Sequence, residues 1–332
     1  MRKILPVIND PPLKSHQYIF LPLCAFLAET CEGNWNWFYN EFTQIFAFDL
    51  NKSEIGIKPY QGMVTPFGDV KIIQSCLEIG DDITDFFKIL INNDYYIVEN
   101  CDDFYIKELQ LKYHRQHDFL IYGYDNETRC FMVKAQHKSK LCDFEVPYSQ
   151  IIEAHNSKHL INPVYNIFLY KYKESNEQIN IEKLKWHLLD YIEGTDTLAR
   201  EAPTSQRDVN MVWGIKVFDR IKKAYQSGMI CGTNNIYCWY EHRQNLLNKF
   251  IHFDKYTDLV YNEQIKEEME NICKKSENIF KLCMKVNIKI KNKFSADDDI
   301  KLLCKSLDEL KPLELNILNR FYKDNKVVFE GI

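Results

Sequence analysis

Three features are missing from the 332-residue sequence, and each absence excludes a class of protein. No pair of cysteines has the C-x-x-C spacing of a zinc ribbon. The longest apolar run, 18–28, contains Pro22 and is too short to span a bilayer. The net charge of -5 is spread without long blocks of one sign, so we expect neither nucleic acid nor an anionic membrane surface as a partner.

The cysteines and the start of the chain favour a cytoplasmic protein. The 11 cysteines are odd in number and scattered, which is unlike a disulfide framework, so we expect reduced thiols. The basic Met1–Lys3 is followed by polar residues and prolines at 9–12, so no signal peptide is expected. A hydrophobic content of 45% and a charged content of 27% are typical of a globular protein with a sizeable core.

The pattern of apolar residues changes about halfway along the chain. Two β-forming runs, 119–124 and 129–134, are separated by turn residues and predict a hairpin. From about residue 175 onward, apolar residues recur at helical spacing. The predicted fold class is therefore α+β, with an antiparallel sheet in a first domain, 1–165, and a helical bundle in a second, mainly helical domain, 166–332.

The predicted hairpin has a register that involves a histidine. With the turn centred between Asn126 and Glu127, Tyr124 lies opposite Arg129, and His117 lies opposite Gln136. The amide of Gln136 would then face the imidazole of His117 from the neighbouring strand.

Cys24 is the candidate nucleophile. Pro22 suits the first turn of a helix, because the N–H that proline lacks is unpaired there anyway. Cys24 would then lie in the first turn, where the partial positive charge of the helix lowers a thiol pKa and can hold an oxyanion. The alternative is that Cys24 is one more small buried apolar residue.

Papain-like enzymes have a cysteine at the start of a helix, a histidine at the start of a strand and an amide or acid on the next strand. The stretch His117–Asp125 resembles the histidine strand of a bacterial family related to the butirosin-biosynthesis H protein, which is itself similar to papain-like and bacteriocin-leader (C39-like) peptidases. Trp213–Asp219 and Tyr240–Arg243 resemble segments that follow the catalytic half in such proteins of nonribosomal peptide clusters.

This resemblance implies a papain-like catalytic domain and residue roles within it. Cys24 would be the nucleophile, His117 the base, and Gln17, seven residues before Cys24, a donor in the oxyanion hole. The sequence departs from the family at the third position, since Gln136 stands where Asp or Asn is usual. Either Gln136 orients His117, or the site is a dyad, or this member has lost the chemistry.

The resemblance also implies an activity. Family members of known activity, as in butirosin assembly and the amide synthase of closthioamide biosynthesis, move an acyl group from a carrier-protein phosphopantetheine thioester to an amine. The first hypothesis is therefore a Cys24-dependent acyltransferase with an acyl or peptidyl carrier protein and an amine as partners. A cysteine peptidase or thioester hydrolase, and a non-catalytic module that binds a carrier protein, are the alternatives.

No metal and no cofactor are expected, apart from 4'-phosphopantetheine as the arm of the carrier-bound substrate. A metal set could be drawn from His114, His117, His137 and Cys142, but nothing in their spacing fixes a ligand geometry.

Overall fold

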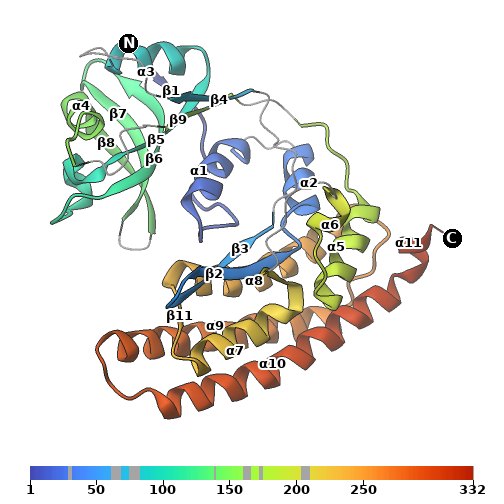
Figure 1. Cartoon of the computed structure of the whole chain (residues 1–332). Coiled ribbons are helices and arrows are strands. Elements are labelled where there is room, and N and C mark those ends of the chain that lie inside the picture. Colours follow the sequence, from blue (N-terminus) through green and yellow to red (C-terminus); the bar gives the residue numbers. More distant parts are fainter. Residues whose placement is uncertain are drawn as a thin grey trace. The chain divides into compact units, whose positions relative to one another are not determined.

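The structure is a computed structural model that describes residues 1–28, 32–60, 69–74, 83–137, 140–159, 166–171, 175–202 and 210–331. The chain divides into two compact units (Figure 1). Unit 1 consists of Met1–Trp35 and Thr65–Asn176, and unit 2 consists of Asn36–Val64 and Glu177–Ile332. Residues 36–64 thus cluster with the C-terminal half, whereas the predicted first domain, 1–165, includes them. The chain is α+β, as predicted, with an antiparallel sheet and a C-terminal helical region.

Unit 1 contains a seven-stranded antiparallel sheet. Its main path runs in the order β4-β9-β5-β6-β7-β8, and β1 pairs with the far end of β6. The strands are β1 (Arg2–Ile4), β4 (Asp69–Gln74), β5 (Tyr95–Asp102), β6 (Gln116–Asp125), β7 (Cys130–His137), β8 (Lys140–Pro147) and β9 (Asn166–Lys171).

Three helices contact this sheet and close the core of unit 1. They are α1 (Gln17–Phe26), α3 (Ile83–Asn92) and α4 (Tyr148–His155), and all three touch β5. Two short 3-10 turns, η1 (Asp103–Tyr105) and η2 (Lys107–Leu109), follow β5 directly. The β-branched and aromatic residues of β5, β6 and β7 supply much of the buried cluster, as their sequence pattern indicates.

The β6–β7 hairpin forms where it was predicted, but its register differs. Tyr124 lies opposite Phe131, and Asp125 lies opposite Cys130, so the predicted pairing of Tyr124 with Arg129 is wrong. Arg129 adopts a left-handed conformation with φ of 55°, which differs from the extended conformation of a strand, so it belongs to the turn. A further irregularity between Ile121 and Gly123 shifts the register once more along the strand.

Helix α1 begins five residues before Pro22, at Gln17. Its first turn is already closed by the hydrogen bond from the Phe20 N–H to the His16 carbonyl, at 3.0 Å. Pro22 therefore lies inside the helix and removes one internal donor. Cys24 is the eighth residue of α1, and the prediction that it lies in the first turn is wrong.

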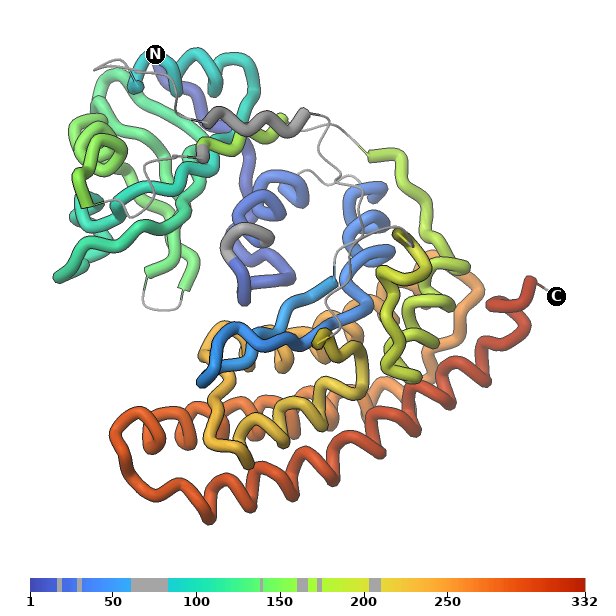
Figure 2. Tube along the Cα trace, viewed as in Figure 1, coloured from blue at the N-terminus to red at the C-terminus, as the bar shows by residue number. Residues whose placement is uncertain are grey.

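Unit 2 combines a small sheet with long helices. The sheet has the order β10-β2-β3-β11, built from β2 (Ile45–Asn51), β3 (Glu54–Pro59), β10 (Val212–Trp213) and β11 (Ile230–Cys231). The blue strands β2 and β3 lie among segments coloured yellow to orange, which belong to the C-terminal half (Figure 2). Together, they form one compact body from segments far apart in sequence.

The helices of unit 2 include three of 24 to 29 residues, α8, α9 and α10, and α9 packs against both others (Figure 1). α10 runs unbroken through Pro312. Across the described ranges, no helix is both long enough and apolar enough to cross a membrane. Helix α2 (Glu32–Asn40) crosses the boundary between the units at Trp35 and Asn36. The other helices are α5 (Ile181–Glu193), α6 (Leu198–Glu201), α7 (Val217–Gln226), α8 (Thr233–Tyr256), α9 (Glu263–Lys291), α10 (Asp297–Asp324) and α11 (Lys326–Glu330), with a 3-10 turn η3 (Gly214–Lys216) before α7.

A fully buried ion pair joins α8 to α10 in unit 2. The Arg243 Nε lies 3.0 Å from the Glu314 Oε2, and neither side chain is exposed to solvent. The Tyr191 hydroxyl of α5 donates to the same carboxylate, and the guanidinium stacks 4.0 Å from the centre of the Trp239 ring. Each charge depends on the other, because an unpaired buried charge is strongly destabilising.

We predict that Glu314→Gln lowers the free energy of unfolding of unit 2 by about 3–5 kcal/mol, because Arg243 is left buried without its counter-charge. Denaturant unfolding followed by circular dichroism measures the change. Glu309→Gln is the matched control on the same helix, where the exposed carboxylate lies 3.9 Å from Lys305. We expect the control to change the free energy by less than about 0.5 kcal/mol, and equal losses in the two variants would contradict the role of the buried pair.

Candidate functional site

The thiol of Cys24 lies in the core of unit 1. Its exposed fraction is 0%, and it belongs to the same apolar cluster as Phe20, Leu21 and Ala25. Burial raises the pKa of the Cys24 thiol to about 12. The charge of Asp143 raises this pKa further, and the Lys134 ammonium lowers it without outweighing burial. At neutral pH the side chain is therefore a protonated thiol, which is a weak nucleophile.

His117 lies at the start of β6 and pairs with Cys101 of β5. Its Nδ1 is 3.8 Å from the Asp103 Oδ2, which is too long for a hydrogen bond. Burial and the neighbouring Arg115 guanidinium lower the pKa of His117 to about 4. The imidazole is consequently neutral at pH 7 and has a low affinity for a proton.

The predicted catalytic residues are held by different neighbours. Within the ranges that the structure describes, no hydrogen bond or ionic contact joins Cys24 to His117. Gln136 pairs with Leu141 of β8, and the β6–β7 ladder starts at Leu120 opposite Lys134, so the pairing predicted for His117 is not observed. Gln17 is the first residue of α1, and the position of its side chain lies outside the described structure.

A group of polar side chains in unit 1 surrounds Asp102, the last residue of β5. The Asp102 carboxylate is 1% exposed, and its Oδ2 lies 2.7 Å from the His114 Nδ1 and 2.5 Å from the Ser157 Oγ. Its Oδ1 accepts hydrogen bonds from the backbone N–H groups of Phe104 and Arg115, both at 3.2 Å. Four donors therefore converge on one buried carboxylate.

These donors keep Asp102 ionised. Burial by itself raises the pKa of Asp102, but the hydrogen bonds from Ser157, His114 and the two backbone amides outweigh burial, and the pKa lies below its usual value. An ionised carboxylate only accepts hydrogen bonds, so the His114 Nδ1 must carry the hydrogen. The Nε2 of a neutral His114 then holds the free lone pair.

Two aromatic rings pack against the ring of His114. Its centre lies 3.7 Å from that of His159, with the two rings nearly parallel, and 4.1 Å from that of Phe104. The Ser157 hydroxyl that donates to Asp102 also accepts a hydrogen bond from the His159 N–H, at 3.2 Å. One hydroxyl thus anchors both the carboxylate and the segment that carries the stacked imidazole.

Asp103 forms a neighbouring pair. Its carboxylate accepts hydrogen bonds from the Arg115 guanidinium through Nε, at 3.0 Å, and through a terminal nitrogen. Burial raises the pKa of Asp103 although Arg115 opposes the shift. The Asp103 Oδ1 is buried and accepts no hydrogen bond from the described residues.

Sequence reasoning named His114 only as a possible metal ligand and missed Asp102, Ser157 and His159. Asp102 and Ser157 are 55 positions apart, and only the sheet brings them together. The readable signal was an Asp-Asp pair ending a β run, followed by His114-x-x-His117. In the part of the chain that the structure describes, no group of three or more His, Cys, Asp or Glu side chains is arranged to hold a metal ion.

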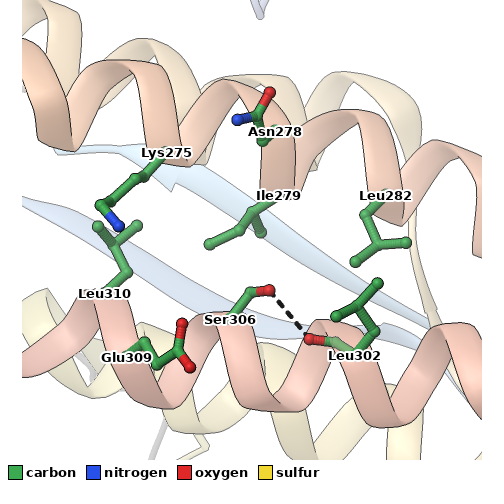
Figure 3. A pocket seen from close by; sticks show the side chains of 8 residues that line it. All are labelled: Lys275, Asn278, Ile279, Leu282, Leu302, Ser306, Glu309 and Leu310. Atoms are coloured by element: carbon green, nitrogen blue, oxygen red, sulfur yellow. Dashed lines mark hydrogen bonds between the residues drawn. The ribbon is translucent and has the colours of Figure 1, made fainter.

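Unit 2 has a hollow of about 320 Å³ between α9 and α10 (Figure 3). Its floor is apolar, and the Ser306 hydroxyl is used within α10, where it donates to the Leu302 carbonyl at 3.0 Å. The lining contains no histidine or cysteine, and its charged side chains are Lys275 and Glu309. The lining residues are Lys275, Asn278, Ile279, Leu282, Leu302, Ser306, Glu309 and Leu310.

Comparison of the chain with models of protein families gives no match, and comparison with curated proteins gives none either.

We predict that Cys24 resists alkylation in the folded protein, because its thiol is enclosed and its pKa is raised to about 12. Incubation with iodoacetamide at pH 7.5, followed by peptide mass mapping, measures the modification of each cysteine. Among the cysteines that the structure describes, Cys130 and Cys142 are partly exposed and should react first. Modification of Cys24 as fast as Cys130 would show that the thiol is reachable.

Proposed function

We propose that unit 1 is a papain-like (C39-like) module of a cytoplasmic protein and that it recognises the acylated phosphopantetheine arm of a carrier protein without forming an acyl-enzyme at Cys24. The resemblance of His117–Asp125 to the histidine strand of carrier-dependent acyltransferases supports the substrate class. The α+β architecture with an antiparallel sheet is compatible with a papain-like fold.

The protonation states of Cys24 and His117 support the second part of the proposal, that no acyl-enzyme forms at Cys24. A cysteine–histidine dyad works when the thiol readily loses a proton and the imidazole readily takes it. Burial shifts both groups the opposite way, with the pKa of Cys24 raised to about 12 and that of His117 lowered to about 4. The ground state therefore disfavours the thiolate–imidazolium pair.

The competing function is the Cys24-dependent acyltransferase, in which an acyl-enzyme passes its acyl group to an amine, or to water in a hydrolase or peptidase. The nearby Lys134 ammonium, which lowers the pKa of Cys24, favours this function, but burial outweighs it. The two proposals differ in one observable, a covalent adduct on Cys24.

The test uses a holo acyl carrier protein loaded with an octanoyl thioester. We expect intact mass spectrometry to show no acyl adduct on the full chain, and calorimetry to show tighter binding of the octanoyl carrier than of the apo carrier. Cys24→Ala should bind like the wild type, because the thiol is enclosed in the apolar core of unit 1.

Cys130→Ala is the matched control, because this thiol is partly exposed and lies on β7 of the same unit. An acyl adduct on the wild type and on the Cys130→Ala variant, but not on Cys24→Ala, would restore the acyltransferase hypothesis. Equal binding of octanoyl and apo carriers would instead reject recognition of the acylated arm.

A further inference from the structure

Four histidines of the described structure lie within 4 Å of a carboxylate, and they differ in how accessible they are. His155 and His187 make short contacts, 2.6 Å to Glu99 and 2.5 Å to Glu201, but their side chains are only 7% and 2% exposed. Both are enclosed and cannot meet a ligand without a rearrangement.

The two accessible histidines differ in whether a hydrogen bond to a carboxylate orients the ring. His117 is 30% exposed, but its contact with Asp103 is 3.8 Å long, so no hydrogen bond fixes its tautomer. His114 is 32% exposed and lies 2.7 Å from Asp102. Among these four, only His114 combines an accessible ring with an orienting carboxylate.

A general base needs this combination. One ring nitrogen must be held by an acceptor, so that the other presents its lone pair outward. Asp102 holds the Nδ1 of His114, and no hydrogen bond to its Nε2 occurs among the residues that the structure describes. The rings of Phe104 and His159 pack against the imidazole, with ring centres 4.1 Å and 3.7 Å away.

We propose that Asp102 and His114 form an acid–base dyad that acts directly on acyl thioesters, with the Nε2 of His114 as the proton acceptor. The proposal of a dyad takes only its class of substrate, acyl thioesters, from the proposed function. Its position, geometry and accessibility come from side chains that the resemblance does not assign.

The reaction that follows has no covalent enzyme intermediate. The Nε2 of His114 removes a proton from an amine or a water molecule while the nitrogen or oxygen attacks the thioester carbonyl carbon. The C–S bond then breaks, and the departing thiolate receives the proton back from His114 Nε2. The products are an amide or a carboxylic acid and a free thiol, with no change of oxidation state.

Asp102 and Ser157 are positioning residues in this scheme. Asp102 holds the tautomer and stabilises the imidazolium while the proton is on the ring. Ser157 fixes the carboxylate at 2.5 Å and carries the segment with His159. The Ser157 hydroxyl donates to Asp102, so it is not itself a nucleophile activated by His114.

The test uses S-acetyl-N-acetylcysteamine, a small thioester without a carrier protein, and follows the release of N-acetylcysteamine by chromatography. We expect His114→Ala to lower kcat/KM by at least about 100-fold, the usual contribution of a general base. Added imidazole should restore part of the rate to His114→Ala, because the substitution leaves an open space beside Asp102. His137→Ala, on β7 of the same sheet, is the matched control and should retain the rate within about twofold.

Asp102→Asn should also lower kcat/KM, and circular dichroism shows whether this buried substitution folds. If it does not, Ser157→Ala tests the same carboxylate more gently and should give a smaller loss. The dyad is rejected if the wild type releases no thiol above the buffer rate, if His114→Ala keeps the rate, or if imidazole restores none of it. Loss of turnover in Cys24→Ala would also reject it, in favour of the thiol.

This probe separates the dyad from the proposed function. If the chain cleaves the small thioester through His114 but does not prefer the octanoyl carrier, the dyad is supported and recognition of the acylated arm is rejected. If the chain prefers the octanoyl carrier but leaves the small thioester intact, recognition of the acylated arm is supported and the dyad is rejected.

Discussion

The carboxylate of Asp102 is the interaction on which the candidate site depends. It is nearly inaccessible to solvent, yet ionised, because four donors from three different segments meet on its two oxygens. A buried carboxylate without such partners would be protonated instead. The turn after β5, the entry to β6 and the segment after α4 therefore have to sit where they do for the charge to be tolerated.

The buried pair of unit 2 shows the same constraint with a different outcome. Arg243 and Glu314 are both enclosed, and Tyr191, Trp239 and Phe218 complete their surroundings. Such a pair holds helices together, but it presents nothing to a ligand. Asp102 is equally buried, whereas its partner His114 is partly exposed. The exposure of His114 is therefore the difference between the two pairs on which our proposal of a dyad rests.

Local patterns predicted the α+β class, the β6–β7 hairpin and the helices of the C-terminal half, because alternation and helical spacing are local properties. The register of the β6–β7 hairpin was predicted wrongly because Arg129 adopts a left-handed conformation, which an arginine in the sequence does not indicate. The start of α1 was missed because Pro22 is tolerated inside a helix whose first turn forms earlier. The Asp102 site was missed because its members converge only through the sheet.

The position of Cys24 separates two kinds of likeness to papain-like enzymes. The likeness of sequence rests on the strand that begins with His117, whereas thiol chemistry depends on what stands at the start of the helix. Gln17 occupies that start, and an amide side chain is no nucleophile. Seven residues further along, the Cys24 thiol has lost the first-turn N–H groups and gained an apolar shell. Under our proposals, recognition of the acylated arm does not depend on this thiol, and acyl chemistry would fall to His114, which has its own carboxylate.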